Sequence, residues 1–218
     1  VPYTVAKMLA ESDKKDLGCH TGTISDAFLE LYQAGKLTNA HKELDTGLSA
    51  WNLAMGSQEL YDWLDAEPQL FHPGDLDYIH SVERISKLSN VISINGGVQL
   101  DLMGQENAES TGTRQLSGVG GQMDFLEGAY RSKGGKGFIC INSSRVTKDG
   151  ERKSNILATI PGGSTISAPR TMIQYVATEY GIASLSGKTL RERAEAMASI
   201  AHPDFREELM KYARENFK

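Results

Sequence analysis

The sequence predicts an α/β domain with a largely parallel or mixed sheet that is flanked by helices. Short apolar segments with the pattern of strands alternate with amphipathic helical segments along the chain, which is typical of α/β folds. The 22 glycines gather in the turns between these segments. Hydrophobic residues make up 39% and charged residues 23% of the 218 residues, which suits a globular protein with a sizeable core.

Each element is predicted from its start and stop signals. Pro2 favours the first turn of a helix, Ser25 or Asp26 and then Ser57 are N-cap residues, and Gly35 ends a helix. In chain order, we expect a helix over 2–11, a loop from residue 16 into a helix that stops at 35, a strand over 49–56, a helix over 57–65, two strands within 90–104 broken at 96–97, a glycine loop and a helix over 122–131, strands at 137–142, 156–161 and 173–181, and helices over 190–201 and 203–217.

The charge balance and the cysteines exclude several classes of function. Twenty-eight acidic against 23 basic residues leave a formal net charge of -5, which does not favour binding to nucleic acid. No stretch approaches the ~20 apolar residues of a membrane-spanning helix, and no signal peptide is present. Cys19 and Cys140 form neither a disulfide framework nor a metal-ligand spacing. We therefore expect a cytoplasmic protein with reduced thiols, no metal and no nucleic-acid or membrane partner.

The segment GVGGQMDF, residues 118–125, is the most informative motif. Gly118, Gly120 and Gly121 directly precede a predicted helix, so backbone amides there can point at an anion. The same donors can stabilise the oxyanion that forms when a thioester carbonyl is attacked. Glycine-rich turns of this kind also occur where only tight packing is needed, and the spacing alone leaves that alternative open. The loop lacks the Lys-Ser/Thr of a Walker motif, so hydrolysis of a nucleoside triphosphate is not expected.

Lysines stand at the glycine turns that follow. Lys133 and Lys136 lie in SKGGKG, residues 132–137, and Lys148 lies in the later turn TKDG. An ammonium group at such a turn can pair with a phosphate as a point charge. A solvated turn lysine is the alternative for each of them.

Other titratable residues have ordinary structural explanations. Glu179 follows a strand, where a hydrogen-bonded structural acid is the simpler interpretation than a catalytic one. His202 precedes a proline and fits a capping or packing role, and Asp204 supplies favourable charge at a helix N-terminus. Cys19 and His20 are adjacent, and adjacent side chains seldom face each other for proton transfer, so a thiolate pair is not favoured.

Six segments carry further information when they are taken together. They are DLGCHTG followed by SD (16–26), SINGGVQLDLMGQ (93–105), SGVGGQMDFLEGAYRSKGGK (117–136), APR (168–170), VATEYGIASLSGKTLRERAEAM (176–197) and IAHPDFREEL (200–209). In this order and spacing, they resemble the acetyl-CoA hydrolase/transferase family of CoA-transferases, particularly its 4-hydroxybutyrate and butyrate:acetate branch. The resemblance implies a family I CoA-transferase type domain. It places the end of an N-terminal domain, or a linker helix, at 1–15 and the C-terminal CoA-transferase domain at 16–218.

The resemblance also implies a reaction and its partners. In this family, a glutamate attacks the acyl-CoA thioester, and an acyl-glutamyl anhydride and then a glutamyl-CoA thioester follow before CoA passes to a carboxylate. Coenzyme A would be present as an acyl-CoA substrate, with a small carboxylate as acceptor. A homologous N-terminal domain, in the same chain or as a separate subunit, would complete the site, and the protein would be an oligomer.

The resemblance assigns roles to individual residues of this chain. Asn95 would face the thioester, Lys148 is a candidate for binding CoA and Lys136 is a less favoured one. The oxyanion or CoA contacts would come from Gly118, Gly120 and Gly121.

The chain departs from the family pattern at the nucleophile. HTE is expected where residues 20–22 are HTG, so Gly22 occupies the position of the glutamate. A smaller departure is SNI, residues 154–156, where an arginine is usual after the serine. Because glycine has no side chain, the covalent route cannot run through residue 22.

Three hypotheses remain open for the function. The chain is a CoA-transferase domain that has lost its glutamate by drift or substitution. Alternatively, it is a subunit of a split acyl-CoA enzyme that does decarboxylation, hydrolysis or cyclisation, with Gly22 making room for an acidic substrate. In the third hypothesis, it is a non-catalytic CoA-binding partner.

Overall fold

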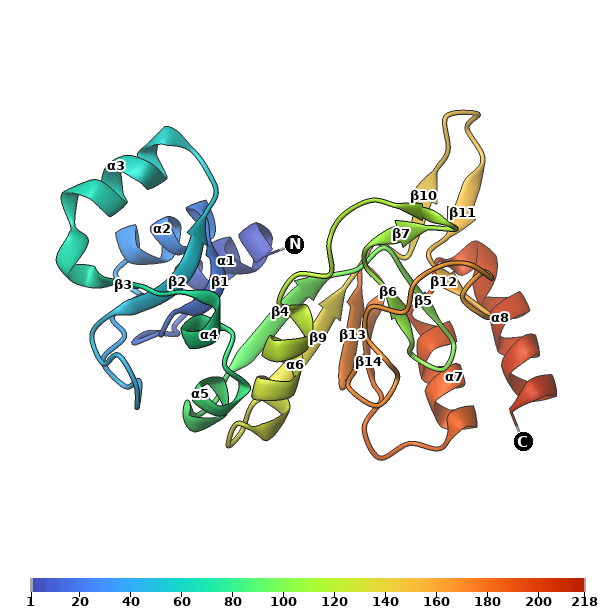
Figure 1. The fold of residues 1–218 in the computed structure, drawn as a ribbon. Helices are drawn as coiled ribbons and strands as arrows, with labels where there is room; N and C mark the ends of the chain where they lie inside the picture. The colour runs from blue at the N-terminus through green and yellow to red at the C-terminus, as the bar shows by residue number, and fades with distance from the viewer. Residues whose placement is uncertain (1, 218) are drawn as a thin grey trace. The chain divides into compact units, whose positions relative to one another are not determined.

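The computed structural model describes residues 2–217, which form two compact units (Figure 1). The first unit comprises residues 1–91 and Arg131–Gly135, and the second comprises Ile92–Tyr130 and Lys136–Lys218. Both units combine helices with parallel or mixed sheets, which confirms the predicted α/β class. The domain boundary expected at residue 15 stays a prediction. Each unit is described by itself below.

The first unit is built on a parallel three-stranded sheet in the order β1-β2-β3. Apolar residues from α1, α2 and α3, among them Ala6, Leu29 and Leu60, form one core with Ile24 of β1. Ser57 begins α3 because its side chain accepts a hydrogen bond from the amide of Leu60. The elements are α1 (Pro2–Glu11), β1 (His20–Ile24), α2 (Asp26–Gln33), β2 (Ser49–Ala54), α3 (Gln58–Ala66), the 3-10 helix η1 (Pro68–Leu70), β3 (Phe71–Pro73), α4 (Leu76–Ile79) and α5 (Val82–Lys87).

The second unit is built on a four-stranded mixed sheet in the order β14-β13-β9-β4. Strands β4, β9 and β13 are parallel, and β14 is antiparallel to β13. A smaller sheet has the order β12-β5-β6, and two hairpins pair β10 with β11 and β7 with β8. The elements are β4 (Ile92–Gly96), β5 (Gln99–Asp101), β6 (Glu106–Asn107), β7 (Ser110–Thr111), β8 (Arg114–Gln115), α6 (Gln122–Arg131), β9 (Lys136–Cys140), β10 (Ser144–Val146), β11 (Arg152–Ser154), β12 (Ile156–Leu157), β13 (Tyr175–Thr178), β14 (Gly181–Ser184), α7 (Leu190–Ser199) and α8 (Pro203–Asn216).

The core of the second unit joins the main sheet to the helices. Ile139 of β9 and Val176 of β13 are fully buried in one cluster with Leu126 of α6 and Met197 of α7. Burial of each such side chain contributes about 1.5–3 kcal/mol. This packing fixes where α6 begins relative to the strands, and the glycine loop immediately precedes that point.

Most predicted elements are present, and three segments differ. Residues 20–24 were expected in a loop but form β1, whose backbone pairs with β2. Residues 173–181 were expected as one strand, whereas β13 ends at Thr178 and a turn leads into β14. Of the strand expected over 156–161, only β12 forms, because its parallel partner β5 is itself short. These differences reflect pairing between distant segments, which local patterns do not encode.

Two searches of residues 2–217 limit what this part of the chain can hold. None of its helices is both long and apolar enough to cross a membrane. Within the same range, no three His, Cys, Asp or Glu side chains come together in a way that would hold a metal ion.

Candidate functional site

The glycine loop before α6 presents free backbone donors to solvent. Gly118 and Gly120 are exposed, and within residues 2–217 the amides of residues 118–121 donate no hydrogen bond. Gly120 has a φ of 62°, a left-handed conformation that favours glycine. The loop leads into the ten-residue helix α6, whose N-terminus carries a partial positive charge. Together these features suit an anion or a developing oxyanion.

Gly118 is not required by the fold. Its φ is outside the left-handed region, and a Cβ built there would meet no atom within 4 Å. Neither packing nor backbone strain explains the missing side chain at this position. A bare backbone that is open to solvent allows close approach of a ligand, which favours the binding interpretation of the loop over the packing one.

Asn95 lies near the carboxyl end of β4, at the level of Ile139 on β9. Its side-chain amide donates to Ser93 Oγ at 2.8 Å and is half-buried. Ligands of open α/β sheets bind outside the carboxyl ends of the strands. Asn95 therefore lies at the end of the sheet where ligands of such folds bind, and its role in facing the thioester stays a prediction.

A buried carboxyl group connects this strand end to the glycine loop, and it was not predicted from the sequence. Glu106 on β6 is 0% exposed, and its Oε2 accepts a hydrogen bond from Gln122, the first residue of α6. A Cβ built on Gly97, just after β4, would lie 2.5 Å from Glu106 Oε1. Burial raises the pKa of Glu106 to about 8, although the Gln122 bond lowers it in part. Glu106 thus contacts both Gly97, after the end of β4, and Gln122, at the start of α6.

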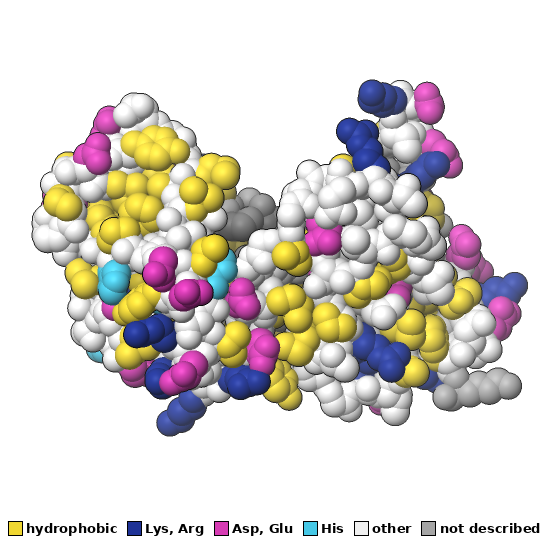
Figure 2. Space-filling view, viewed as in Figure 1, with side chains coloured by type: hydrophobic (Ala, Val, Ile, Leu, Met, Phe, Trp, Pro, Cys, Tyr) yellow, Lys and Arg dark blue, Asp and Glu magenta, His cyan; other side chains and the backbone are white. Residues whose placement is uncertain are grey.

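The two predicted CoA-binding lysines lie at different places in the second unit. Lys136 pairs with Ile92 at the start of β4, so it lies at the opposite end of the strands from Asn95. Lys148 is exposed in the turn that joins β10 to β11. Figure 2 shows several basic side chains gathered on this projecting hairpin, which carries Arg145, Arg152 and Lys153. Their roles in binding CoA stay predictions.

Gly22 belongs to the first unit, in the middle of β1. It therefore lies in a different unit from Asn95 and the glycine loop. Its neighbours Thr21 and Thr23 pair with Trp51 and Leu53 of β2, so backbone pairing holds the segment in an extended form. The strand keeps this shape without any side chain at residue 22.

The Cys19–His20 pair is not a reactive thiolate. Cys19 is 1% exposed, and burial raises the pKa of its thiol to about 12, against the opposing effect of Lys42. His20 Nε2 lies 2.8 Å from the carbonyl of Ile79, which fixes this nitrogen as the donor. Burial also lowers the pKa of His20. The structural interpretation of both residues holds.

A polar network beside β1 was not predicted from the sequence. Lys42 Nζ donates to the carbonyls of Cys19 at 2.8 Å and Leu48 at 2.6 Å. Asp45 has a φ of 52°, and its Oδ1 accepts from Tyr78 Oη at 2.8 Å and contacts His72 Nδ1 at 2.9 Å. These side chains tie loops to strand ends that are far apart in the sequence, so a local pattern cannot reveal them.

Glu179 and His202 have the structural roles that were preferred for them. Glu179 accepts from the amide of Ser143 at 2.9 Å and from its hydroxyl at 2.6 Å. His202 Nδ1 accepts from the amide of Asp204 at 3.3 Å and caps α8, and its ring packs against Tyr180. Neither residue is left with the free reactive atom that a catalytic base needs.

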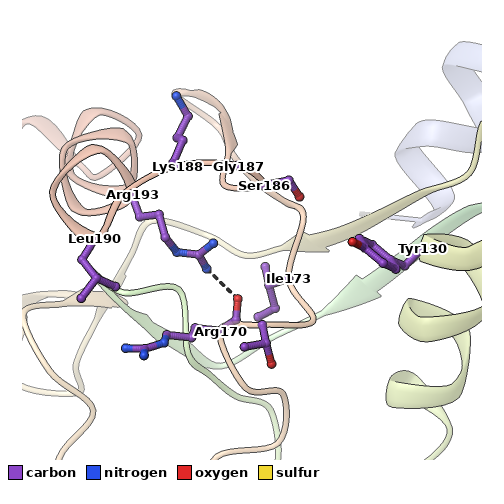
Figure 3. Close-up of a pocket in the computed structure, with 9 residues that line it drawn as sticks. Tyr130, Arg170, Ile173, Ser186, Gly187, Lys188, Leu190 and Arg193 are labelled. Carbon is purple, nitrogen blue, oxygen red and sulfur yellow. Dashed lines mark hydrogen bonds between the residues drawn. The ribbon is translucent and has the colours of Figure 1, made fainter.

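A concave feature of this unit is an open hollow of about 280 Å³ near the start of α7 (Figure 3). Arg193 extends from α7 and donates to the carbonyls of Arg170, Leu185 and Met103, which satisfies it inside the fold. None of the described residues that line the hollow is acidic. Its polar lining is Tyr130, Arg170, Thr171, Ser186, Lys188 and Arg193.

Comparison with known proteins identifies similar sequences. Residues 56–213 match the protein family described as acetyl-CoA hydrolase/transferase C-terminal domain. The chain is 45% identical over 213 residues to the butyryl-CoA:acetate CoA-transferase of Anaerostipes caccae, an alignment that covers 98% of this chain and 48% of that relative. The chain spans about half the length of the curated relatives it matches.

Solved structures with the same fold include two that resemble the chain along nearly its whole length. RipA from Yersinia pestis is 38% identical with a TM-score of 0.88, covering 98% of this chain and 47% of RipA. The 4-hydroxybutyrate CoA-transferase of Porphyromonas gingivalis is 36% identical with a TM-score of 0.82, covering 99% of this chain and 49% of that enzyme.

Proposed function

The chain belongs to the acetyl-CoA hydrolase/transferase family, through its C-terminal domain, and we propose that it is the C-terminal part of a CoA-transferase. In this proposal, the complete protein moves CoA between a short acyl-CoA and a small carboxylate. An N-terminal half, in the same chain or as a separate subunit, supplies the rest of the site. The relative from Anaerostipes caccae, whose name specifies butyryl-CoA and acetate, indicates the size of substrate that we expect.

The single observation that carries the proposal is the 45% identity over 213 residues to that relative. The glycine loop supports it, because residues 118–121 offer unbonded backbone amides at the start of a helix. In our proposal, these amides bind the oxyanion of the attacked thioester and Asn95 faces the same group. Lys148, and less directly Lys136, would contact the phosphates of CoA.

Gly22 prevents the proposed covalent transfer in the unchanged chain, because glycine has no side chain to act as the nucleophile. We propose that residue 22 is the position of the family's nucleophilic carboxylate, so the chain as it stands cannot form an acyl-glutamyl anhydride there. Because backbone pairing holds Thr21 and Thr23 on β2, we expect β1 to keep its extended form when a carboxylate is returned to residue 22.

The test is Gly22→Glu in a protein completed with an N-terminal half from a relative. We expect CoA transfer to rise on the order of 10³-fold or more over the unchanged chain, because the nucleophile carries most of the covalent route. A glutamyl-CoA adduct should be detectable at residue 22 by mass spectrometry. Gly22→Gln is the matched control, since it adds the same bulk without a nucleophile. If Gly22→Glu gave no adduct and no more transfer than Gly22→Gln, the proposal would be wrong.

A second candidate function follows from the same glycine. An acyl-CoA enzyme that needs no acceptor carboxylate, or a partner that only binds CoA, has no use for a glutamate at residue 22. In this case, the completed protein with Gly22 unchanged should bind acetyl-CoA in calorimetry. Release of free CoA without an added carboxylate would then favour hydrolysis, and binding without turnover would favour the binding partner.

A further inference from the structure

Glu106 has an unusual environment for a glutamate. The whole residue is 0% exposed, and its backbone is fixed on both sides, by pairing with Leu100 of β5 and by hydrogen bonds with the segment at Ala168. Its Oε2 is bonded by Gln122. Within residues 2–217, no group donates a hydrogen bond to its Oε1.

The surroundings of this carboxyl group are apolar or neutral. Gly97 lies against Oε1, and the same small space is bounded by the side chains of Ile139 from β9 and Ile141, which follows β9. Gln122, the partner from α6, is uncharged. Among residues 2–217, no cation contributes to the shift in the pKa of this carboxyl group.

Charged side chains do occur on the elements that pack around Glu106, but they are engaged or placed elsewhere. Asp101 of β5 is bonded to the side chain of Gln105 and to the amide of Met103. Lys136 is at the far end of β9, where it pairs with Ile92. Asp124 lies in the first turn of α6. The pKa of Glu106 follows from burial, which raises it to about 8, and from the Gln122 bond, which lowers it.

An ionised carboxylate with one unbonded oxygen is costly in such a site, so the carboxyl group is protonated near neutral pH. Its zero exposure also excludes Glu106 as a substitute nucleophile in this conformation, because a nucleophile must touch the substrate. Any effect of the Glu106 carboxyl group on a ligand must therefore pass through a residue that it contacts.

That neighbour is Gln122, which directly follows the glycine loop. The amide of Phe125 donates to the carbonyl of Gly121 at 3.2 Å, so the first turn of α6 and the end of the loop are one bonded unit. Gln122 anchors this unit to the strand layer through Glu106. Gly118 and Gly120, by contrast, are exposed, and a Cβ built on either would meet no atom within 4 Å.

We propose that Glu106 is a positioning residue whose neutral carboxyl group, bonded to Gln122, fixes the start of α6 and with it the backbone donors of residues 118–121. Ionisation of Glu106 requires water to enter the site, since no cation is at hand. The contact with Gln122 then loosens and the glycine loop loses its fixed geometry. The effect on ligand binding rests on the proposed function. The coupling between Glu106 and the glycine loop does not.

The coupling can be tested on the 218-residue chain without any substrate. Infrared spectra recorded through a pH titration should contain a carbonyl band of a protonated carboxylic acid that disappears near pH 8 and is absent from Glu106→Gln. In protein labelled with ¹³C-glycine, the Cα resonances of Gly118, Gly120 and Gly121 should shift with the same midpoint. In Glu106→Gln, which keeps the shape and neutrality of the acid, these resonances should not titrate. Glu151→Gln, which removes an exposed carboxylate of the same unit, should behave like the unchanged chain.

A second variant keeps the inference testable if Glu106→Gln fails to fold. Gln122→Met removes the amide but keeps an unbranched side chain. Because the Gln122 bond lowers the pKa of Glu106, this variant should move the infrared midpoint to higher pH. The inference would be wrong if the infrared band of Glu106 titrated with a midpoint near pH 4.5. It would also be wrong if the glycine resonances did not change as Glu106 titrates.

The outcome for acyl-CoA separates the two proposals. In the completed protein, affinity for acetyl-CoA should fall as the pH passes 8, and Glu106→Gln should retain its affinity over the same range. If the infrared and glycine titrations behave as expected but no acetyl-CoA binds at any pH, the proposed function fails and the coupling stands. If acetyl-CoA binds but both proteins show the same pH dependence, the positioning role fails.

Discussion

The two units differ at residue 22, where we propose that the family's carboxylate is missing, and at Glu106, which keeps its carboxyl group. In the first unit, residue 22 has no side chain at all, yet β1 keeps its extended shape because its backbone pairs with β2. In the second unit, Glu106 keeps its carboxyl group in a fully buried site, and no cation of residues 2–217 contributes to the shift in its pKa. Under our proposal for residue 22, the scaffold outlasts its reactive group, since the hydrogen bonds that shape a strand do not pass through its side chains.

The units also differ in what holds their functional segments. Near β1, polar side chains reach across to backbone groups, as Lys42 does to Cys19 and Leu48. Near the glycine loop, the anchor is a fully buried apolar core beneath α6, with one carboxyl–amide contact at the helix start. We therefore expect core substitutions to disturb the second site through packing, and charge substitutions to disturb the first.

The largest effect on stability should come from cavities in the two cores. Leu126→Ala in the second unit and Leu60→Ala in the first each remove a side chain that is 0% exposed, and each should cost about 2–5 kcal/mol. Hydrogen exchange measured residue by residue should rise mainly in the unit that carries the substitution. Equal increases in both units after either substitution would contradict the description of two separate cores.

The next effect is a fall in the stability of the second unit with rising pH, caused by Glu106. The folded-state pKa of Glu106, about 8, lies above the ordinary value of 4.5, so the protonated group stabilises the fold fully below that value. This contribution is lost as the pH rises through 8. Urea unfolding followed by a probe in the second unit should show falling stability from about pH 5 to about pH 8. Glu106→Gln should flatten that dependence, and an unchanged slope would contradict the assignment.

A smaller and more local effect is expected at the glycine loop. Gly118→Ala adds a methyl group into open space, so stability should stay the same or rise by about 0.4–1 kcal/mol. Affinity of the completed protein for acetyl-CoA should fall on the order of tenfold if a backbone donor to the oxyanion is displaced. Gly162→Ala is the matched control, because a Cβ there also meets nothing within 4 Å. A Gly118→Ala protein that binds like Gly162→Ala would favour the packing interpretation of the loop.

The smallest effect concerns the lysines. Lys148→Ala should weaken acetyl-CoA binding by about twofold to fivefold, the range of an exposed ion pair, and the loss should shrink at high salt. Lys136→Ala should have less effect, because Lys136 lies at the other end of the strands from Asn95. Calorimetry at two salt concentrations distinguishes these outcomes, and a larger loss for Lys136→Ala would reverse the order we assign.

Local signals account for the parts of the fold that were predicted correctly. The glycine loop and the helical pattern place α6 at Gln122–Arg131, and the proline after His202 separates α7 from α8. Strand β1 escaped prediction because HTGTI lacks apolar alternation and forms only through its distant partner β2. Asn95 and the loop were assigned by resemblance, and their presence at one end of the sheet follows from the parallel order of the strands.

Glu106 shows why the rest of the site could not be predicted. Glutamate is seldom fully buried, so GQENAES indicates a polar surface segment. Its burial depends on three contacts from elsewhere in the chain, with Gly97, with Gln122 and with the backbone at Ala168. A pattern in one short segment carries no information about such a combination.

The close approach of Gly97 to Glu106 has a consequence for how this protein can evolve. Any side chain at residue 97 would place its Cβ 2.5 Å from Glu106 Oε1 and 3.0 Å from Ile141 Cγ2. Replacing Gly97 while Glu106 is present therefore requires the carboxyl group to shift, whereas Glu106 can be exchanged for a shorter residue without that shift. Among homologous chains, a glutamate at residue 106 should accordingly be accompanied by glycine at residue 97, and the order of the two historical substitutions should be readable from their ancestors.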